Sequence, residues 1–166
     1  SDPRHLAIRG RRARLRRRVA MGEGSDMTDT THTPWHLWVV GIATLLFNAI
    51  GCYSYLMTQT GSLAELGMTP EQIGYFDTFP AWADAAWALG VWGALLGSIL
   101  LLLRRKLAFA AFAVATVGLI ATTYFELLVS QIPDSLQNPL LMAAIWISTL
   151  FSLWYSRWMS AAGVLR

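Results

Sequence analysis

"GVWGALLGSILLLLRRKLAFAAFAVATVG" (residues 90–118) joins two apolar runs through three consecutive positive charges, Arg104, Arg105 and Lys106. Each run continues beyond the quoted stretch and is long enough to cross a bilayer as a helix. Charged side chains are costly in hydrocarbon, whereas Lys and Arg collect in the cytoplasmic loops of membrane proteins. The stretch therefore predicts two membrane-spanning helices joined by a tight turn, whose charges set the topology.

The whole chain has the composition of a membrane protein. Of its 166 residues, 55% are hydrophobic and only 14% are charged, against about 25% charged residues in a soluble domain. Four stretches contain no Asp, Glu, Lys or Arg: 30–64, 85–103, 107–125 and 135–156. One small soluble domain cannot bury four fully apolar helices. We therefore predict an all-α fold, a four-transmembrane-helix bundle with helices at about 35–57, 82–103, 107–130 and 139–159.

The distribution of charge predicts the orientation of this bundle. All 13 Lys and Arg residues lie towards the termini or in the turn at 104–106, and the loops at 58–81 and 131–138 contain none. Positive charge marks the cytoplasmic side. We therefore expect a protein of the bacterial inner membrane, embedded in the lipid bilayer, with both termini in the cytoplasm.

The N-terminal segment differs from the rest of the chain. Residues 1–26 are rich in arginine and contain no apolar run, so we do not expect them to form a signal peptide. Arg-rich ends can bind nucleic acid or anionic lipid. We favour a disordered extension, made of upstream or added sequence, and expect no nucleic-acid partner. The natural start would then be Met27, and residues 27–166 would form a single membrane domain.

The first outer loop contains the signature of a short helix. Thr69 can cap it, Pro70 suits its first position, and Gln72 completes a capping box. We expect a short interfacial helix at 70–78. Its lipid-facing side chains would be Ile73 and Phe76, with Tyr75 as a third candidate.

Small residues recur at helical spacing on the two central spans. They are Gly90, Gly93 and Gly97 on the second span and Ala111, Ala115 and Gly118 on the third. Small residues four apart allow helix backbones to approach closely. These faces should pack inward, and the spacing leaves open whether the partner is another helix of the chain or a second copy.

Four polar residues are candidates for a cavity that opens outward: Glu126, Asp84, Asn48 and Tyr55. Glu126 follows the small-residue face of the third span, and an ionisable group in a membrane helix is a functional candidate. Three of them also have a simpler interpretation. Asn48 can form an interhelical hydrogen bond, Asp84 suits the positive N-terminal end of its helix, and Glu126 can be a solvated interfacial acid.

No catalytic or cofactor motif is found. The four spans lack paired haem ligands, a lysine for a Schiff base and a nucleophile–base pair. His32 and His36 are separated by Pro34, which argues against a shared metal-binding face, and Cys52 is the only cysteine. We predict that the chain is not an enzyme and binds no metal or cofactor.

Three stretches carry a resemblance to a known family: NAIGCYSYLMTQT (48–60), YFDTFPAWADAAWALGVWGALLGSILLLLRRKLA (75–108) and WYSRWMSAAGVLR (154–166). The chain resembles an uncharacterised family of small four-helix bacterial inner-membrane proteins, often called sugar transporters. Its members tend to carry Asp-Tyr where this chain has Ser54-Tyr55. The resemblance implies the fold and the membrane location.

Two classes of function remain. The first is a transport-related protein for a small solute or sugar, which would act as a homodimer because four helices are few for alternating access. The second is a structural or accessory subunit of a larger membrane protein complex. In that case the glycine-rich face of the second span and Trp92 would be docking surfaces.

Overall fold

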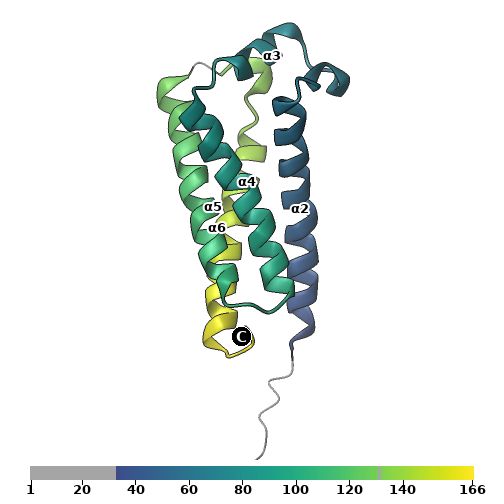
Figure 1. Ribbon diagram of the computed structural model, residues 1–166, viewed down its shortest axis with the longest axis vertical. Helices are drawn as coiled ribbons and strands as arrows, with labels where there is room; N and C mark the ends of the chain where they lie inside the picture. The colour runs from purple at the N-terminus through teal and green to yellow at the C-terminus, as the bar shows by residue number, and fades with distance from the viewer. Residues whose placement is uncertain (1–32, 131) are drawn as a thin grey trace, which may run out of the picture. The chain divides into compact units, whose positions relative to one another are not determined.

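The computed structural model describes residues 33–130 and 132–166. All of the regular secondary structure in these residues is helical (Figure 1). Its long helices are α2 (Trp35–Gln59), α4 (Ala81–Leu102), α5 (Leu107–Tyr124) and α6 (Pro139–Ala161). A π-helical segment, Phe125–Val129, extends α5, and short helices occupy Leu63–Leu66, Pro70–Asp77 (α3) and Asp134–Leu136. The predicted all-α four-helix fold is confirmed. The predicted extension at 1–26 and His32 lie outside the described residues.

Four helices are long enough and apolar enough to cross a membrane: Trp35–Gln59, Ala81–Leu102, Leu107–Val129 and Pro139–Ala161. Their ends lie within two residues of the ends predicted from the apolar runs. The chain is therefore a multi-pass membrane protein.

The helices pack as a series rather than as a closed ring. α2 packs on α4, α4 on α5, and α5 on α6, whereas α2 and α6 make few contacts with each other. The α4–α5 turn and the C-terminal residues lie at one end of the bundle, and α3 lies at the other (Figure 1). We call these the turn end (residues 103–106 and 162–166) and the loop end (60–80 and 132–138).

The closest approach is between α4 and α5. A Cβ atom on Gly118 would lie 2.5 Å from the carbonyl oxygen of Ala86, and one on Gly93 would lie 3.2 Å from the amide nitrogen of Ala115. Backbones can come this near only where glycine removes the side chain. The small-residue faces of the two helices therefore meet each other, inside the chain.

Three of the four long helices end in the same way. The residue after the last turn has a positive φ at the ends of α2, α4 and α6, and it is Gly61, Arg104 and Gly163 respectively. After α4, the amide of Arg105 donates to the Leu100 carbonyl at 2.8 Å, the hydrogen bond that defines a Schellman motif. Glycine adopts this backbone freely, whereas an arginine does so at a cost.

The C-terminal segment covers this turn. The amide of Lys106 donates to the Arg166 carbonyl at 3.0 Å, and the amide of Arg166 donates to the Arg104 carbonyl at 2.6 Å. Val164 and Leu165 are buried beneath these bonds. The apolar runs did not predict this contact, because the segment is short and lies beyond the fourth span.

The main apolar core also lies towards the turn end. Its members are Leu37, Leu101, Ala108, Phe112, Tyr155, Met159, Val164 and Leu165. On α2, the His36 ring accepts from or donates to the Tyr155 hydroxyl at 2.6 Å and stacks on Trp158. This contact joins α2 to α6 near the turn end.

At the loop end, α3 begins with the predicted capping box. The Thr69 amide donates to the Gln72 side chain at 2.9 Å, and the Gln72 amide donates to the Thr69 hydroxyl at 3.4 Å. Tyr75 does not face outward as expected, since it is only 8% exposed. Its ring packs edge-on against Phe79, which in turn packs against Phe125 of the π-helical segment. These aromatic contacts attach α3 to the end of the bundle.

Candidate functional site

Asn48 lies in the seam between α2 and α4. Its amide nitrogen donates to the Ala94 carbonyl at 3.2 Å and to the Ser98 hydroxyl at 2.9 Å. Ser98 is fully buried and donates to the same carbonyl of Ala94. Asn48 therefore links two spans by hydrogen bonds.

Tyr55 and Asp84 lie along the same seam, nearer the loop end. The side chain of Gln59 donates to Asp84 Oδ1 at 3.4 Å. The Tyr55 ring packs edge-on against Trp87, with 5.1 Å between ring centroids. Three of the four candidate residues thus line one helix–helix contact, and each has a partner on the neighbouring helix.

Glu126 lies on a different element, the π-helical segment that extends α5. The stripe of small residues on α5 passes through Thr122, and the next positions on that stripe are 125 and 126. Phe125 takes the buried position, at 4% exposed, and Glu126 is half-buried. The aromatic side chain, rather than the carboxylate, therefore continues the packed face of α5.

An open pocket of about 600 Å³ lies between α3 and the end of α5. We call it the loop pocket. It is lined by Glu71, Gly74, Tyr75, Thr78, Pro80, Phe125, Val129, Ser130 and Pro133. Its wall combines two aromatic rings, hydroxyl groups and a carboxylate with the apolar side chains of Pro80, Val129 and Pro133. None of the four residues predicted to form a cavity is among those that line it.

Tyr75 is the most enclosed polar residue of the loop pocket. Its hydroxyl lies 3.1 Å from the Ser130 hydroxyl, which donates in turn to the Glu126 backbone carbonyl at 3.1 Å. Burial raises the pKa of the Tyr75 phenol, the charge of Glu126 adds to the rise, and the hydrogen bond with Ser130 opposes it. Sequence reasoning missed Tyr75 and Ser130, because their proximity depends on how α3 folds back onto α5.

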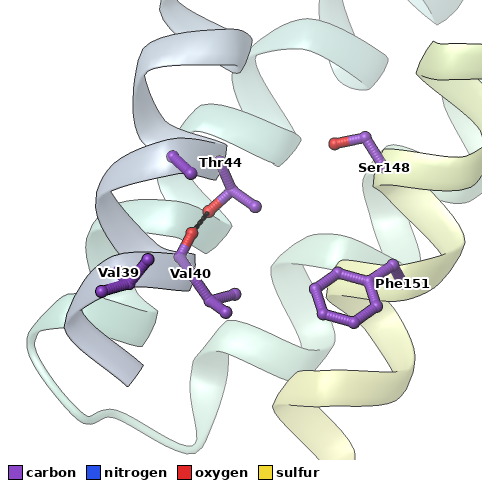
Figure 2. Close-up of a pocket in the computed structure, with 6 residues that line it drawn as sticks. Val39, Val40, Thr44, Ser148 and Phe151 are labelled. Atoms are coloured by element: carbon purple, nitrogen blue, oxygen red, sulfur yellow. Dashed lines mark hydrogen bonds between the residues drawn. The ribbon is translucent and has the colours of Figure 1, made fainter. Parts of the chain in front are cut away.

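A second pocket, of about 290 Å³, lies between α2 and α6. We call it the α2–α6 groove. It is lined by Val39, Val40, Ala43, Thr44, Ser148 and Phe151. Figure 2 shows Thr44 on one side and Ser148 and Phe151 on the other, facing each other across the groove.

The two hydroxyls of the groove differ in their bonding. Thr44 donates to the Val40 carbonyl of its own helix at 2.8 Å (Figure 2). Further along α6, Ser152 and Ser160 bond likewise to carbonyls four residues earlier. Within the described part of the chain the Ser148 hydroxyl makes no such bond. Its hydroxyl therefore lines the groove without a hydrogen-bond partner among the described residues.

Among the residues that the structure describes, no three His, Cys, Asp or Glu side chains come close enough to hold a metal ion. His36 is engaged with Tyr155 and Trp158. Comparison with protein-family models, with curated proteins and with solved structures gives no match.

Proposed function

We propose that this membrane protein is an accessory subunit, without catalytic activity, that packs against another membrane-embedded chain in the bacterial inner membrane. The α2–α6 groove carries this proposal. Helices associate within lipid through close packing and interhelical hydrogen bonds, and small residues permit the approach. The groove offers Ala43 and Thr44 on one wall and the Ser148 hydroxyl on the other.

The weak contact between α2 and α6 supports the same interpretation. α6 packs on α5 and touches α2 near the turn end, through His36 and its two aromatic partners. Above that contact the groove separates the two helices. Side chains of a helix from another chain can enter this space and contact both walls.

Purification in a mild detergent, followed by measurement of the mass of the complex, tests this proposal. We expect unrelated chains in fixed stoichiometry with this one. Ser148→Phe fills the groove and should release them. Ile147→Phe is the matched control, because residue 147 lies on the same helix at the same depth and its side chain is 68% exposed. A parent that remains a monomer, or equal loss in both variants, would contradict the proposal.

A transport-related role for a small solute or sugar is the second candidate, and the loop pocket favours it. Aromatic rings that stack on an apolar face, together with hydroxyl and carboxylate groups, suit a sugar or a similar polar solute. The family resemblance points the same way. This role predicts a lone homodimer in the mass measurement and loss of solute binding in Tyr75→Phe. A homodimer that binds no sugar or polar solute would count against it.

The proposed orientation places the turn end in the cytoplasm. The basic residues within the described chain are Arg104, Arg105, Lys106, Arg157 and Arg166, all at or near the turn end. The acidic ones are Glu65, Glu71, Asp77, Asp84, Glu126 and Asp134, all at or near the loop end. This separation supports both termini being cytoplasmic.

A further inference from the structure

Five basic side chains gather at the turn end, and we call them the basic cluster: Arg104, Arg105, Lys106, Arg157 and Arg166. The C-terminal segment brings Arg166 to the turn, where its backbone bonds to that of Lys106 and of Arg104. No acidic residue of the described chain lies at this end. Within the described part of the chain, no acidic side chain therefore offsets the positive charge of this surface.

Arg104 occupies a position that would suit glycine better. It has φ of 57°, and the equivalent positions after α2 and α6 are Gly61 and Gly163. A residue that keeps an unfavourable backbone conformation is a candidate for function. The turn itself does not need arginine. We therefore attribute the presence of arginine at this position to its side chain.

The guanidinium of Arg104 is only partly used within the chain. Its Nε donates to the Val164 carbonyl at 3.2 Å, which fixes the direction of the group. Its Nη2 is buried and has no hydrogen-bond partner among the described residues. A buried donor left without a partner is costly, so a phosphate oxygen that reaches Nη2, once the atoms that cover it move aside, would remove that cost.

Arg157 brings positive charge from α6 to the same region. Its guanidinium lies over the ring of Phe109 on α5, 5.7 Å from the centroid. Phe109 is one turn from Arg105 and Lys106, so the charges of both helices lie near one another. Trp154 and Trp158, which are exposed on α6, stack on each other beside this position.

We infer that the basic cluster binds the phosphate headgroup of an anionic phospholipid, with Arg104 as the central ligand. Guanidinium groups bind phosphate oxygens through directed hydrogen bonds. The cluster lies where α4 ends and α5 begins, which is the depth of the lipid headgroups whichever way the chain is oriented. Exposed Leu103 and Leu107 flank the turn and offer an apolar surface for the acyl chains.

The position of the cluster favours a lipid over a soluble partner. Tryptophan rings at the end of a span lie at the level of the headgroups. Basic pockets between membrane helices bind anionic headgroups, whereas a free phosphate gains nothing from the apolar residues beside the site. The inference does not depend on the proposed accessory role.

The test uses the full chain, purified in detergent and mixed with equal amounts of dioleoylphosphatidylglycerol and dioleoylphosphatidylcholine. Native mass spectrometry then measures the ratio of the two lipids that stay bound. We expect the parent to retain phosphatidylglycerol selectively. Arg104→Gly should lower the ratio about five-fold, since each basic residue near an anionic surface contributes a factor of about that size. Arg157→Gln should lower it by a similar factor.

Arg104→Gly is a suitable variant because glycine fits the turn, which offsets the loss of the hydrogen bond to the Val164 carbonyl. Its thermal stability in detergent should therefore stay close to that of the parent. Arg104→Lys should retain part of the selectivity, through charge without the guanidinium fork. An excess of inorganic phosphate should leave the bound lipid in place. Equal retention of the two lipids by the parent, an unchanged ratio in Arg104→Gly and Arg157→Gln, or displacement by inorganic phosphate would overturn the inference.

Discussion

The polar side chains deep in the spans bond mainly to helix backbones. Asn48 reaches a carbonyl and a hydroxyl of the neighbouring helix, while Thr116 and Thr122 bond to carbonyls of their own helix. Hydrocarbon supplies no alternative partner for such groups. The buried hydroxyl of Thr123 and the hydroxyl of Ser148 are exceptions, since they have no partner among the described residues. The bonding of the others favours packing over solute binding at this depth.

Asn48→Ala removes both hydrogen bonds between α2 and α4. We expect it to lower the free energy of unfolding by about 0.6–2 kcal/mol, the usual range for such a bond between membrane helices. Thermal unfolding in detergent measures this. Thr58→Ala is the control, because the Thr58 hydroxyl bonds only to its own helix, at the Ser54 carbonyl, and should have a smaller effect. An Asn48→Ala chain as stable as the parent that fails to form its complex would show that Asn48 acts in binding instead.

Tyr75 gives a pH dependence whose sign follows from its pKa. Burial and the charge of Glu126 raise that pKa in the folded chain, so the folded state holds the proton at pH values where an unfolded tyrosine, with a pKa of about 10, has lost it. This contribution to stability is fully present at pH values below the pKa of Tyr75 in the unfolded chain. It is lost as the pH rises through the pKa of Tyr75 in the folded chain. Tyr75→Phe should remove this loss of stability at alkaline pH.

Glu126→Gln should bring the pKa of Tyr75 down without returning it to the ordinary value, because burial is the larger cause. Titration of phenolate absorbance, with Tyr75→Phe as the reference, follows the change. An unaltered titration in Glu126→Gln would mean that the carboxylate does not act on Tyr75.

The contact between α4 and α5 leaves the least room for a larger side chain. A Cβ atom on Gly118 meets backbone atoms of Ala86 and Gly90, which cannot rotate away. Gly118→Ala should therefore force the helices apart and cost about 1–3 kcal/mol of stability, as overpacking does. Thermal unfolding of the purified chain measures the loss.

Gly74→Ala is the matched control for this contact. A Cβ atom on Gly74 meets nothing within 4 Å, and alanine favours a helix over glycine by up to about 1 kcal/mol. This variant should be as stable as the parent or more so. Equal stability of Gly118→Ala and Gly74→Ala would contradict the close approach of α4 and α5.

Features that depend on residues close together in the sequence could be predicted. The apolar runs predicted the four spans, and the pattern from Thr69 to Gln72 predicted the start of α3. The order of the helices around the bundle could not be predicted, because in a membrane both the inward and the lipid-facing sides are apolar. The α2–α6 groove and the loop pocket depend on that order. They were found only in the structure.

At the level of the whole molecule, charge separates the two ends. Basic residues of the described chain gather at the turn end and acidic ones at the loop end. A bilayer keeps such ends on opposite sides, since moving a charged loop through hydrocarbon is costly. The four spans and the position of the basic cluster are therefore both consistent with the proposed orientation.

Labelling of single cysteines on intact bacterial cells tests this arrangement. In a Cys52→Ser background, a cysteine is placed at the exposed position of Glu65 in one variant and at that of Arg105 in another. A thiol reagent that cannot cross the membrane is then added before and after the cells are opened. We predict that Glu65→Cys reacts on intact cells and that Arg105→Cys reacts only after they are opened. Reaction of Arg105→Cys on intact cells, or of both positions from the same side, would contradict four spans with the turn end in the cytoplasm.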